Sequence, residues 1–337
     1  MNSLLLIKNE AQKQMLKTVE DVFGDGTLYS LNYTCDYRLD DMLKFDIADP
    51  IALIGAATKL MDLNPIPQSL MPGLGCSAFL AHDSNGHILL GRNYDIKHEM
   101  TALLMRSAAQ KDSIPSLSLA DMGWFGYQKG DLNDGKHDNS LCIAAPYLPV
   151  EGMNEKGLAI CVLQLMGCTT RQDTGKKKSI TTLAIRNVLD KAGNVEEAIE
   201  IFRSRDMVST REGFDYHFFL ADPSGRSAVV EYKDDEMHVI DADRVTNFFL
   251  CDPNGILQVG RERYDAIDGI LRYREGRLEK EEVLEVLKLV SQPSGGTKGR
   301  SNTRWSAIYD LMDLSIDIYV DHQHQRPYHI SMKEDIE

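Results

Sequence analysis

"PGLGCSAFLAHDSNGHILLGRNYD", residues 72–95, places a cysteine directly behind Gly-Leu-Gly and ends on an arginine and an aspartate. Two apolar runs, 77–82 and 87–92, flank the sequence DSNG at 83–86, whose residue types are typical of a tight hairpin turn. A hairpin returns Arg92 and Asp95 to the strand end that carries Cys76. The stretch therefore predicts two antiparallel strands with a cysteine and two charged side chains at one end.

Cys76 can act as a nucleophile only if a base removes its proton, because an unperturbed thiol has a pKa of about 8.5. Cleavage of the Gly75–Cys76 bond would create an α-amine with a pKa of about 7.7–8.0, which can serve as that base. Gly75 suits such a cleavage because its carbonyl is unhindered and glycine tolerates strained backbone. A histidine distant in the sequence is an alternative base, and a buried structural thiol is a third interpretation.

Arg92 and Asp95 fit the same chemistry. A guanidinium near the sulfur favours the thiolate, and a carboxylate can accept hydrogen bonds from the new α-amine and hold it in place. The alternative is an exposed Arg–Asp pair, which contributes little to stability.

The composition excludes several classes of protein. The chain has 337 residues, is 43% hydrophobic and 26% charged, and contains no low-complexity run, as expected of a globular protein. A net charge of −14 argues against a nucleic-acid partner. The apolar runs are too short for a signal peptide or a membrane helix, so we expect a cytoplasmic protein without a membrane partner. Six scattered cysteines without zinc-site spacing predict no metal, and we expect no organic cofactor.

The chain divides near the cysteine. Helical spacing over 3–23 and 49–62, a strand over 28–37 and a proline- and glycine-rich linker at 64–75 predict a helical leader, 1–75, before a catalytic domain, 76–337. Hairpins and paired helices in that domain indicate α+β layers and not a doubly wound sheet. The expected strands are 157–165, 215–221, 226–232, 236–241, 245–250, 303–310, 315–320 and 327–331, and the expected helices are 180–192, 195–205, 260–274 and 279–291.

Three motifs in order carry a family resemblance: GCSAF at 75–79, GRNYD at 91–95 and GMNEKGL at 152–158. Together they resemble the choloylglycine hydrolases, N-terminal-nucleophile enzymes that include bile salt hydrolases, penicillin V acylases and other linear-amide hydrolases. The resemblance implies a four-layer αββα sandwich with two antiparallel sheets between helical layers. The long leader before Gly-Cys is similar to that of acid ceramidase and isopenicillin-N acyltransferase relatives, whose leader is cut by the protein itself and stays bound.

The resemblance also implies site residues. Cys76 corresponds to the nucleophile, Arg92 and Asp95 to the pair that tunes and anchors it, Asn247 to the oxyanion-stabilising asparagine, and Arg304 to a second active-site arginine. Gln164 lies at a substrate-binding position where bile salt hydrolases have asparagine and penicillin V acylases have tyrosine. Because Gln164 matches neither, an N-acyl amide or N-acyl amino acid ranks above a conjugated bile salt as substrate.

We therefore expect self-cleavage at Gly75–Cys76, followed by hydrolysis of a linear amide through an acyl-enzyme on Cys76. One alternative is acyl transfer to a thiol or amine acceptor, and another is a non-catalytic binding protein with the same fold. The expected partners are a small N-acyl amide and the retained leader fragment 1–75. Nothing in the sequence decides whether the protein forms a homo-oligomer.

Overall fold

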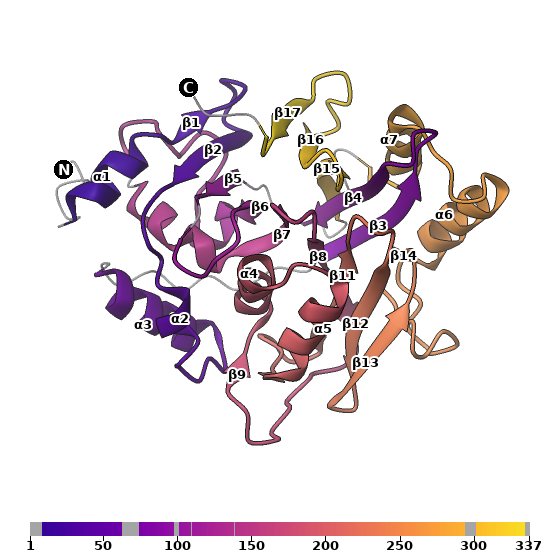
Figure 1. Ribbon diagram of the computed structural model, residues 1–337, viewed down its shortest axis with the longest axis horizontal. Coiled ribbons are helices and arrows are strands. Elements are labelled where there is room, and N and C mark those ends of the chain that lie inside the picture. The colour runs from indigo at the N-terminus through magenta and orange to yellow at the C-terminus, as the bar shows by residue number, and fades with distance from the viewer. Residues whose placement is uncertain are drawn as a thin grey trace.

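Two sheets form the centre of the protein (Figure 1). The computed structural model describes residues 9–62, 74–97, 101–108, 110–137, 139–293 and 301–333. The nine-stranded sheet has the order β1 (Glu20–Asp21), β2 (Leu28–Tyr33), β5 (Ala102–Ser107), β6 (Ser116–Asp121), β7 (Pro149–Asn154), β8 (Ala159–Met166), β11 (Phe214–Ala221), β12 (Ser227–Lys233) and β13 (Glu236–Asp241). The six-stranded sheet has the order β14 (Arg244–Val245), β3 (Leu74–His82), β4 (Ile88–Ile96), β15 (Asn302–Asp310), β16 (Ser315–Val320) and β17 (Tyr328–Ser331).

Helices cover the outer face of each sheet. The helices α4 (Thr181–Lys191) and α5 (Val195–Arg203) contact the nine-stranded sheet, and α6 (Arg261–Tyr273) and α7 (Lys280–Leu289) contact the six-stranded sheet. The remaining elements are α1 (Glu10–Leu16), α2 (Leu39–Met42), α3 (Pro50–Met61), the 3₁₀ segments Met122–Phe125 and Asn139–Tyr147, and a small pair, β9 (Lys178–Ser179) and β10 (Asp206–Met207). The expected αββα sandwich is thus confirmed.

Successive side chains of β3 point to opposite faces of the sheet and therefore join two different hydrophobic clusters. Cys76, Ala78 and Leu80 belong to the main core between the sheets, whereas Phe79 and Ala81 pack in the cluster beneath α6 and α7. Gly91 lies opposite Phe79, and a Cβ at Gly91 would lie 2.8 Å from the Phe79 ring. The glycine of the second motif therefore leaves room for this ring, and the hairpin can pack tightly against α7.

The leader segment takes part in the main sheet. Its strand β2 pairs with β5 from Leu28↔Ala102 to Tyr33↔Ser107, and this pairing is parallel. The two sheets are therefore antiparallel except at this junction, among the pairings described for them. Tyr29, Tyr33 and Tyr37 of the leader are all buried in the main core. Figure 1 shows the leader, in indigo and violet, along one side of the nine-stranded sheet.

Most expected elements lie where the sequence placed them, with three differences. The helix expected over 3–23 is α1, Glu10–Leu16, followed by the short strand β1; residues 1–8 lie outside the described part. The strand expected over 245–250 is the two-residue β14, because hydrogen bonds to side chains and loops take up the backbone after Val245. Most of the expected linker, residues 64–73, lies outside the described residues, and Gly75 lies inside β3.

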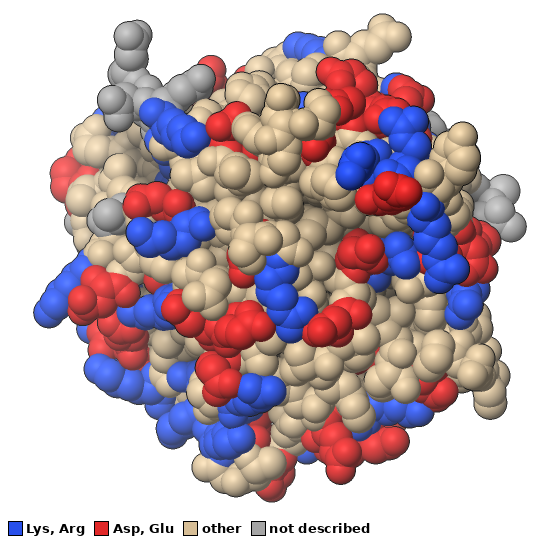
Figure 2. All heavy atoms as spheres, turned by 45° about the vertical axis from the view of Figure 1, so that its right-hand side comes forward, with Lys and Arg blue, Asp and Glu red and all other residues tan. Residues whose placement is uncertain are grey.

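The outer surface carries both signs of charge. Figure 2 shows acidic and basic side chains interspersed on the face that it presents. None of the helices in the described part of the chain combines the length and apolar content that a bilayer crossing requires.

Candidate active site

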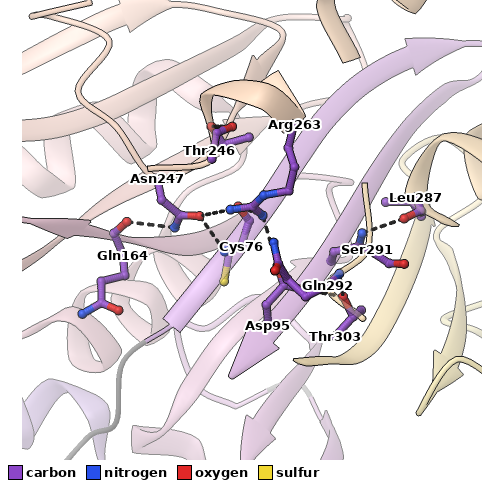
Figure 3. Close-up of polar contacts among 12 residues, drawn as sticks. Cys76, Asp95, Gln164, Thr246, Asn247, Arg263, Leu287, Ser291, Gln292 and Thr303 are labelled. Carbon is purple, nitrogen blue, oxygen red and sulfur yellow. Dashed lines mark hydrogen bonds and ion pairs between the residues drawn. The ribbon is translucent and has the colours of Figure 1, made fainter. Parts of the chain in front are cut away.

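Cys76 lies in the middle of the molecule and has no exposed surface. Its backbone pairs with Tyr94 across the β3–β4 hairpin. Its N–H donates to Oδ1 of Asn247 at 2.8 Å, and its carbonyl oxygen accepts from Nη1 of Arg263 at 2.9 Å (Figure 3). The peptide group on each side of the cysteine Cα is thus held by a polar side chain from another part of the chain.

The Cys76 thiol shares the space between the sheets with Arg92. Burial raises the pKa of the Cys76 thiol, and the Arg92 guanidinium opposes this effect. Arg92 is fully buried and donates from Nε to Glu151 at 2.8 Å and from Nη2 to the carbonyl of Val162 at 2.6 Å. Because the guanidinium is fixed by both sheets, it supplies a stationary positive charge that favours the thiolate.

Glu151 is a component of this site that the sequence analysis did not identify. Besides Arg92, its carboxylate accepts from Trp305 Nε1 at 3.1 Å and from the Tyr309 hydroxyl at 2.8 Å. Glu151 directly precedes the third motif, but an acidic residue in an apolar strand gives no sequence signal for its partner. Within that motif, Asn154 holds the end of α4 by donating to the carbonyls of Leu189 and Ala192.

Asp95 lies at the other side of the cysteine, where its backbone pairs with Gly75. Its carboxylate is fully buried, contacts Arg263 Nη1 at 3.1 Å and accepts from the Thr303 hydroxyl at 2.6 Å. Burial raises the pKa of Asp95 to about 7, although Arg263 and Thr303 oppose the rise. Arg92 and Asp95 are therefore not an ion pair with each other: one pairs with Glu151 and the other with Arg263.

Asn247 joins the two sheets. Its Oδ1 accepts from Cys76 N and from Arg263 Nη2, the latter at 2.7 Å, and its Nδ2 donates to the carbonyl of Gln164 at 2.9 Å. These partners define which way the amide faces. The Nδ2 group has a second hydrogen, which can be donated to an oxygen near the cysteine. In Figure 3 the buried Gln164 side chain extends away from Asn247.

The second arginine beside Cys76 is Arg263, whereas the sequence analysis expected Arg304. Arg304 lies at the bulge between Thr303 and Trp305, and its guanidinium pairs with Asp321 at 3.7 Å. Arg263 reaches the cysteine from the first turn of α6. The Arg263 guanidinium lies against Gly260, the N-cap residue of α6, whose backbone φ is 76°. A Cβ on Gly260 would be 2.5 Å from Arg263 Nη2. Only the tertiary packing of α6 reveals this contact.

Among the described residues, two groups of side chains have ligand atoms close enough for a metal ion: His87 with Asp310 and Asp313, and Asp131 with Asp134 and His137. Each group includes an exposed residue, and neither contains a member of the cluster around Cys76. They carry no chemistry that bears on the cysteine.

Comparisons with known proteins identify the family and the fold. Residues 76–249, just over half of the chain, match the family described as linear amide C-N hydrolases, choloylglycine hydrolase family. A solved variant of the conjugated bile acid hydrolase from Clostridium perfringens is similar at 16% identity and a TM-score of 0.57, over 77% of this chain and 94% of that one. Penicillin V acylase from Agrobacterium tumefaciens is similar at 19% identity and a TM-score of 0.53, over 77% and 87%. At these identities the structural likeness establishes the fold. Among curated proteins, no sequence relative matches the chain.

Proposed function

The chain belongs to the choloylglycine hydrolase family of linear amide C-N hydrolases and is a hydrolase of carbon–nitrogen bonds in linear amides, and we propose that it first cleaves its own Gly75–Cys76 bond and then uses Cys76 as an N-terminal nucleophile. The observation that carries the proposal is the hydrogen bonding of Cys76. Asn247 and Arg263 hold its N–H and C=O, and the charges of Arg92 and Asp95 lie beside it.

Self-cleavage needs the Cys76 thiol, the Gly75 carbonyl and one water molecule. The Cys76 sulfur attacks the Gly75 carbonyl carbon, the C–N bond breaks, and the thiol proton passes to the departing nitrogen, which becomes the α-amine. Water then hydrolyses the thioester to the Gly75 carboxylate and restores the thiol. Asn247 Oδ1 already accepts from this nitrogen, which supports its retention in place once it is an amine.

Turnover repeats the same chemistry on an external amide. The α-amine takes the thiol proton while sulfur attacks the acyl carbon, and the proton then passes to the leaving amine. Water hydrolyses the acyl-enzyme. The second N–H of Asn247 Nδ2 is the proposed oxyanion donor, a contribution on the order of 3 kcal/mol when such a donor is preorganised. Arg263, in place of Arg304, is the proposed second active-site arginine.

The leader is proposed to stay bound as a small subunit, residues 1–75. Besides the β2–β5 pairing, the Tyr33 hydroxyl donates to the Ile143 carbonyl at 2.7 Å, and the Tyr37 hydroxyl donates to Asp190 at 2.6 Å. Asp190 in turn pairs with the fully buried Arg186. Dissociation would expose these tyrosines and leave buried polar groups without partners, which is unfavourable.

The proposed substrate is a small N-acyl amide or N-acyl amino acid. The support is the buried Gln164 side chain, which differs from the residue types at this position in both named subgroups. Conjugated bile acids rank below this class for the same reason.

Intact mass of the purified protein tests the proposal. Wild-type protein is expected to give two chains of about 8 and 29 kDa (75/337 and 262/337 of 37.9 kDa), and Cys76→Ala is expected to remain one chain. Cys76→Ser is a second comparison, because a hydroxyl keeps the proton chemistry with a weaker nucleophile. Wild-type protein that stays at 37.9 kDa while hydrolysing amides would contradict self-cleavage.

A further inference from the structure

A buried histidine lies against the segment that carries Asn247. His217 on β11 has no exposed surface, and both of its ring nitrogens face acceptors. Nε2 lies 2.7 Å from the carbonyl oxygen of Thr246, and Nδ1 lies 3.1 Å from Oε2 of Glu231 on β12. Because a carbonyl oxygen can only accept, Nε2 must carry a hydrogen.

Glu231 is the ionised partner of this histidine. Its carboxylate also accepts from the backbone N–H groups of Leu250, at 3.2 Å, and Cys251, at 2.6 Å. Burial would raise the pKa of Glu231, but the hydrogen bond and charge of His217 and the N–H of Cys251 lower it overall. The His217 ring is thus held at both nitrogens, by the Thr246 carbonyl at Nε2 and by the Glu231 carboxylate at Nδ1.

His217 and Glu231 form hydrogen bonds to the backbone on both sides of Asn247. His217 binds the carbonyl of Thr246, the residue directly before it, and Glu231 binds the N–H groups of Leu250 and Cys251 just after it. The Thr246 hydroxyl adds a hydrogen bond to the carbonyl of Gly260 at 3.0 Å. The pairing of β14 with β3 ends at Val245, so segment 246–251 has no strand partner among the described residues. Hydrogen bonds from side chains hold this segment in place of backbone hydrogen bonds to a neighbouring strand.

Stability alone does not account for this arrangement. A buried histidine and carboxylate lose their hydration on folding, and well-packed apolar residues of similar volume are often as stabilising or more so. Apolar side chains, however, cannot fix the position of a carbonyl and two N–H groups. We propose that His217 and Glu231 are positioning residues that hold Asn247 in its catalytic orientation; this rests on the proposed role of Asn247.

The proposal predicts a loss of turnover with little change in substrate binding. Glu231→Gln removes the charge and turns an amide N–H toward backbone donors, which releases the segment after Asn247. A displacement of a catalytic group by an ångström can cost on the order of 100-fold, so we expect kcat to fall about 10- to 100-fold with KM nearly unchanged. Release of glycine from an N-acyl glycine supplies the measurement.

A double-mutant cycle separates positioning from stability. If Glu231 acts through Asn247, then Glu231→Gln should lower kcat in the wild-type background and have almost no further effect in Asn247→Ala. Asp206→Asn is the matched control. Asp206 is a buried carboxylate that also accepts from two backbone N–H groups, those of Thr174 and Lys176, but it belongs to the β9–β10 pair. Its loss should lower the melting temperature while kcat per folded molecule is retained.

Each outcome decides one point. Equal losses from Glu231→Gln in both backgrounds, or no loss in either, would overturn the positioning role. Full activity of Asn247→Ala would instead refute the proposed function of Asn247 itself. An independent readout is ¹⁵N NMR of the histidines. The His217 ring signals should shift in Glu231→Gln, which loses the carboxylate at Nδ1, and stay as in the wild type in Asp206→Asn; unchanged His217 signals in Glu231→Gln would contradict the inference.

Discussion

Replacement of Asp95 by asparagine tests the role of the negative charge that lies beside Cys76. Asp95→Asn keeps the size of the side chain and leaves an amide oxygen for the Thr303 hydroxyl, but removes the charge that pairs with Arg263. A hydrogen bond to a charged group is worth about 1.5–3 kcal/mol, so self-cleavage and amide turnover should both fall about 10- to 100-fold.

The pH dependence should change in the same variant. Because the pKa of Asp95 is raised to about 7, the ionised form that can hold an amine increases as pH rises through about 7. Wild-type turnover should therefore rise over this range, and Asp95→Asn should lack this step. Stability should move in the opposite direction. The stability associated with Asp95 is complete below its ordinary value of 3.8 and is lost as pH rises through about 7.

The assays are single-turnover self-cleavage, followed by gel densitometry, and kcat/KM for an N-acyl glycine, each across pH. Asp190→Asn is the matched control, because Asp190 is also a buried carboxylate that pairs with a buried arginine, Arg186. It should lower the melting temperature without removing the pH step. A wild-type step that persists unchanged in Asp95→Asn, with both rates retained, would refute this account of Asp95.

Three further outcomes are expected. Arg263→Gln should reduce turnover at least tenfold, since it removes donors to Cys76 O, Asp95 and Asn247. Arg304→Gln should change turnover little, because Arg304 pairs with Asp321. A larger loss of kcat/KM in Arg304→Gln than in Arg263→Gln would restore Arg304 to the site. The two chains should elute together in native size exclusion, and Tyr37→Phe should speed their separation in mild urea because it removes the leader's hydrogen bond to Asp190; an active, stable 76–337 chain alone would show that the leader is dispensable. In a substrate panel, N-acyl amino acids should exceed glyco- and tauro-conjugated bile acids in kcat/KM; a tenfold preference for bile acids, about 1.4 kcal/mol, would reverse the ranking.

The hairpin and its chemistry are readable from the sequence because they are local. Only residues 83–87 separate the two strands, so a tight loop and strict alternation are enough to place Cys76, Arg92 and Asp95 near one another. The α+β layering and most helices follow from hairpin and helical patterns in the same way, whereas the family and its four-layer arrangement came from a resemblance carried by three motifs. The strand predicted over 28–37 is present as β2, but nothing in its pattern indicates that its neighbour is β5 or that the pairing is parallel.

The rest of the site depends on contacts between distant segments. Asn247 could be named only through a family resemblance, and its orientation depends on Gln164, Cys76 and Arg263, which lie on three other elements. Arg263 and Arg304 are equivalent as residue types, and only the packing of α6 brings the first to the cysteine. Sequence pattern records which side chains face a core, because burial of apolar surface is non-directional. Hydrogen bonds and ion pairs are directional and require particular atoms to meet, so only the tertiary structure decides which arginine, carboxylate and amide form the site.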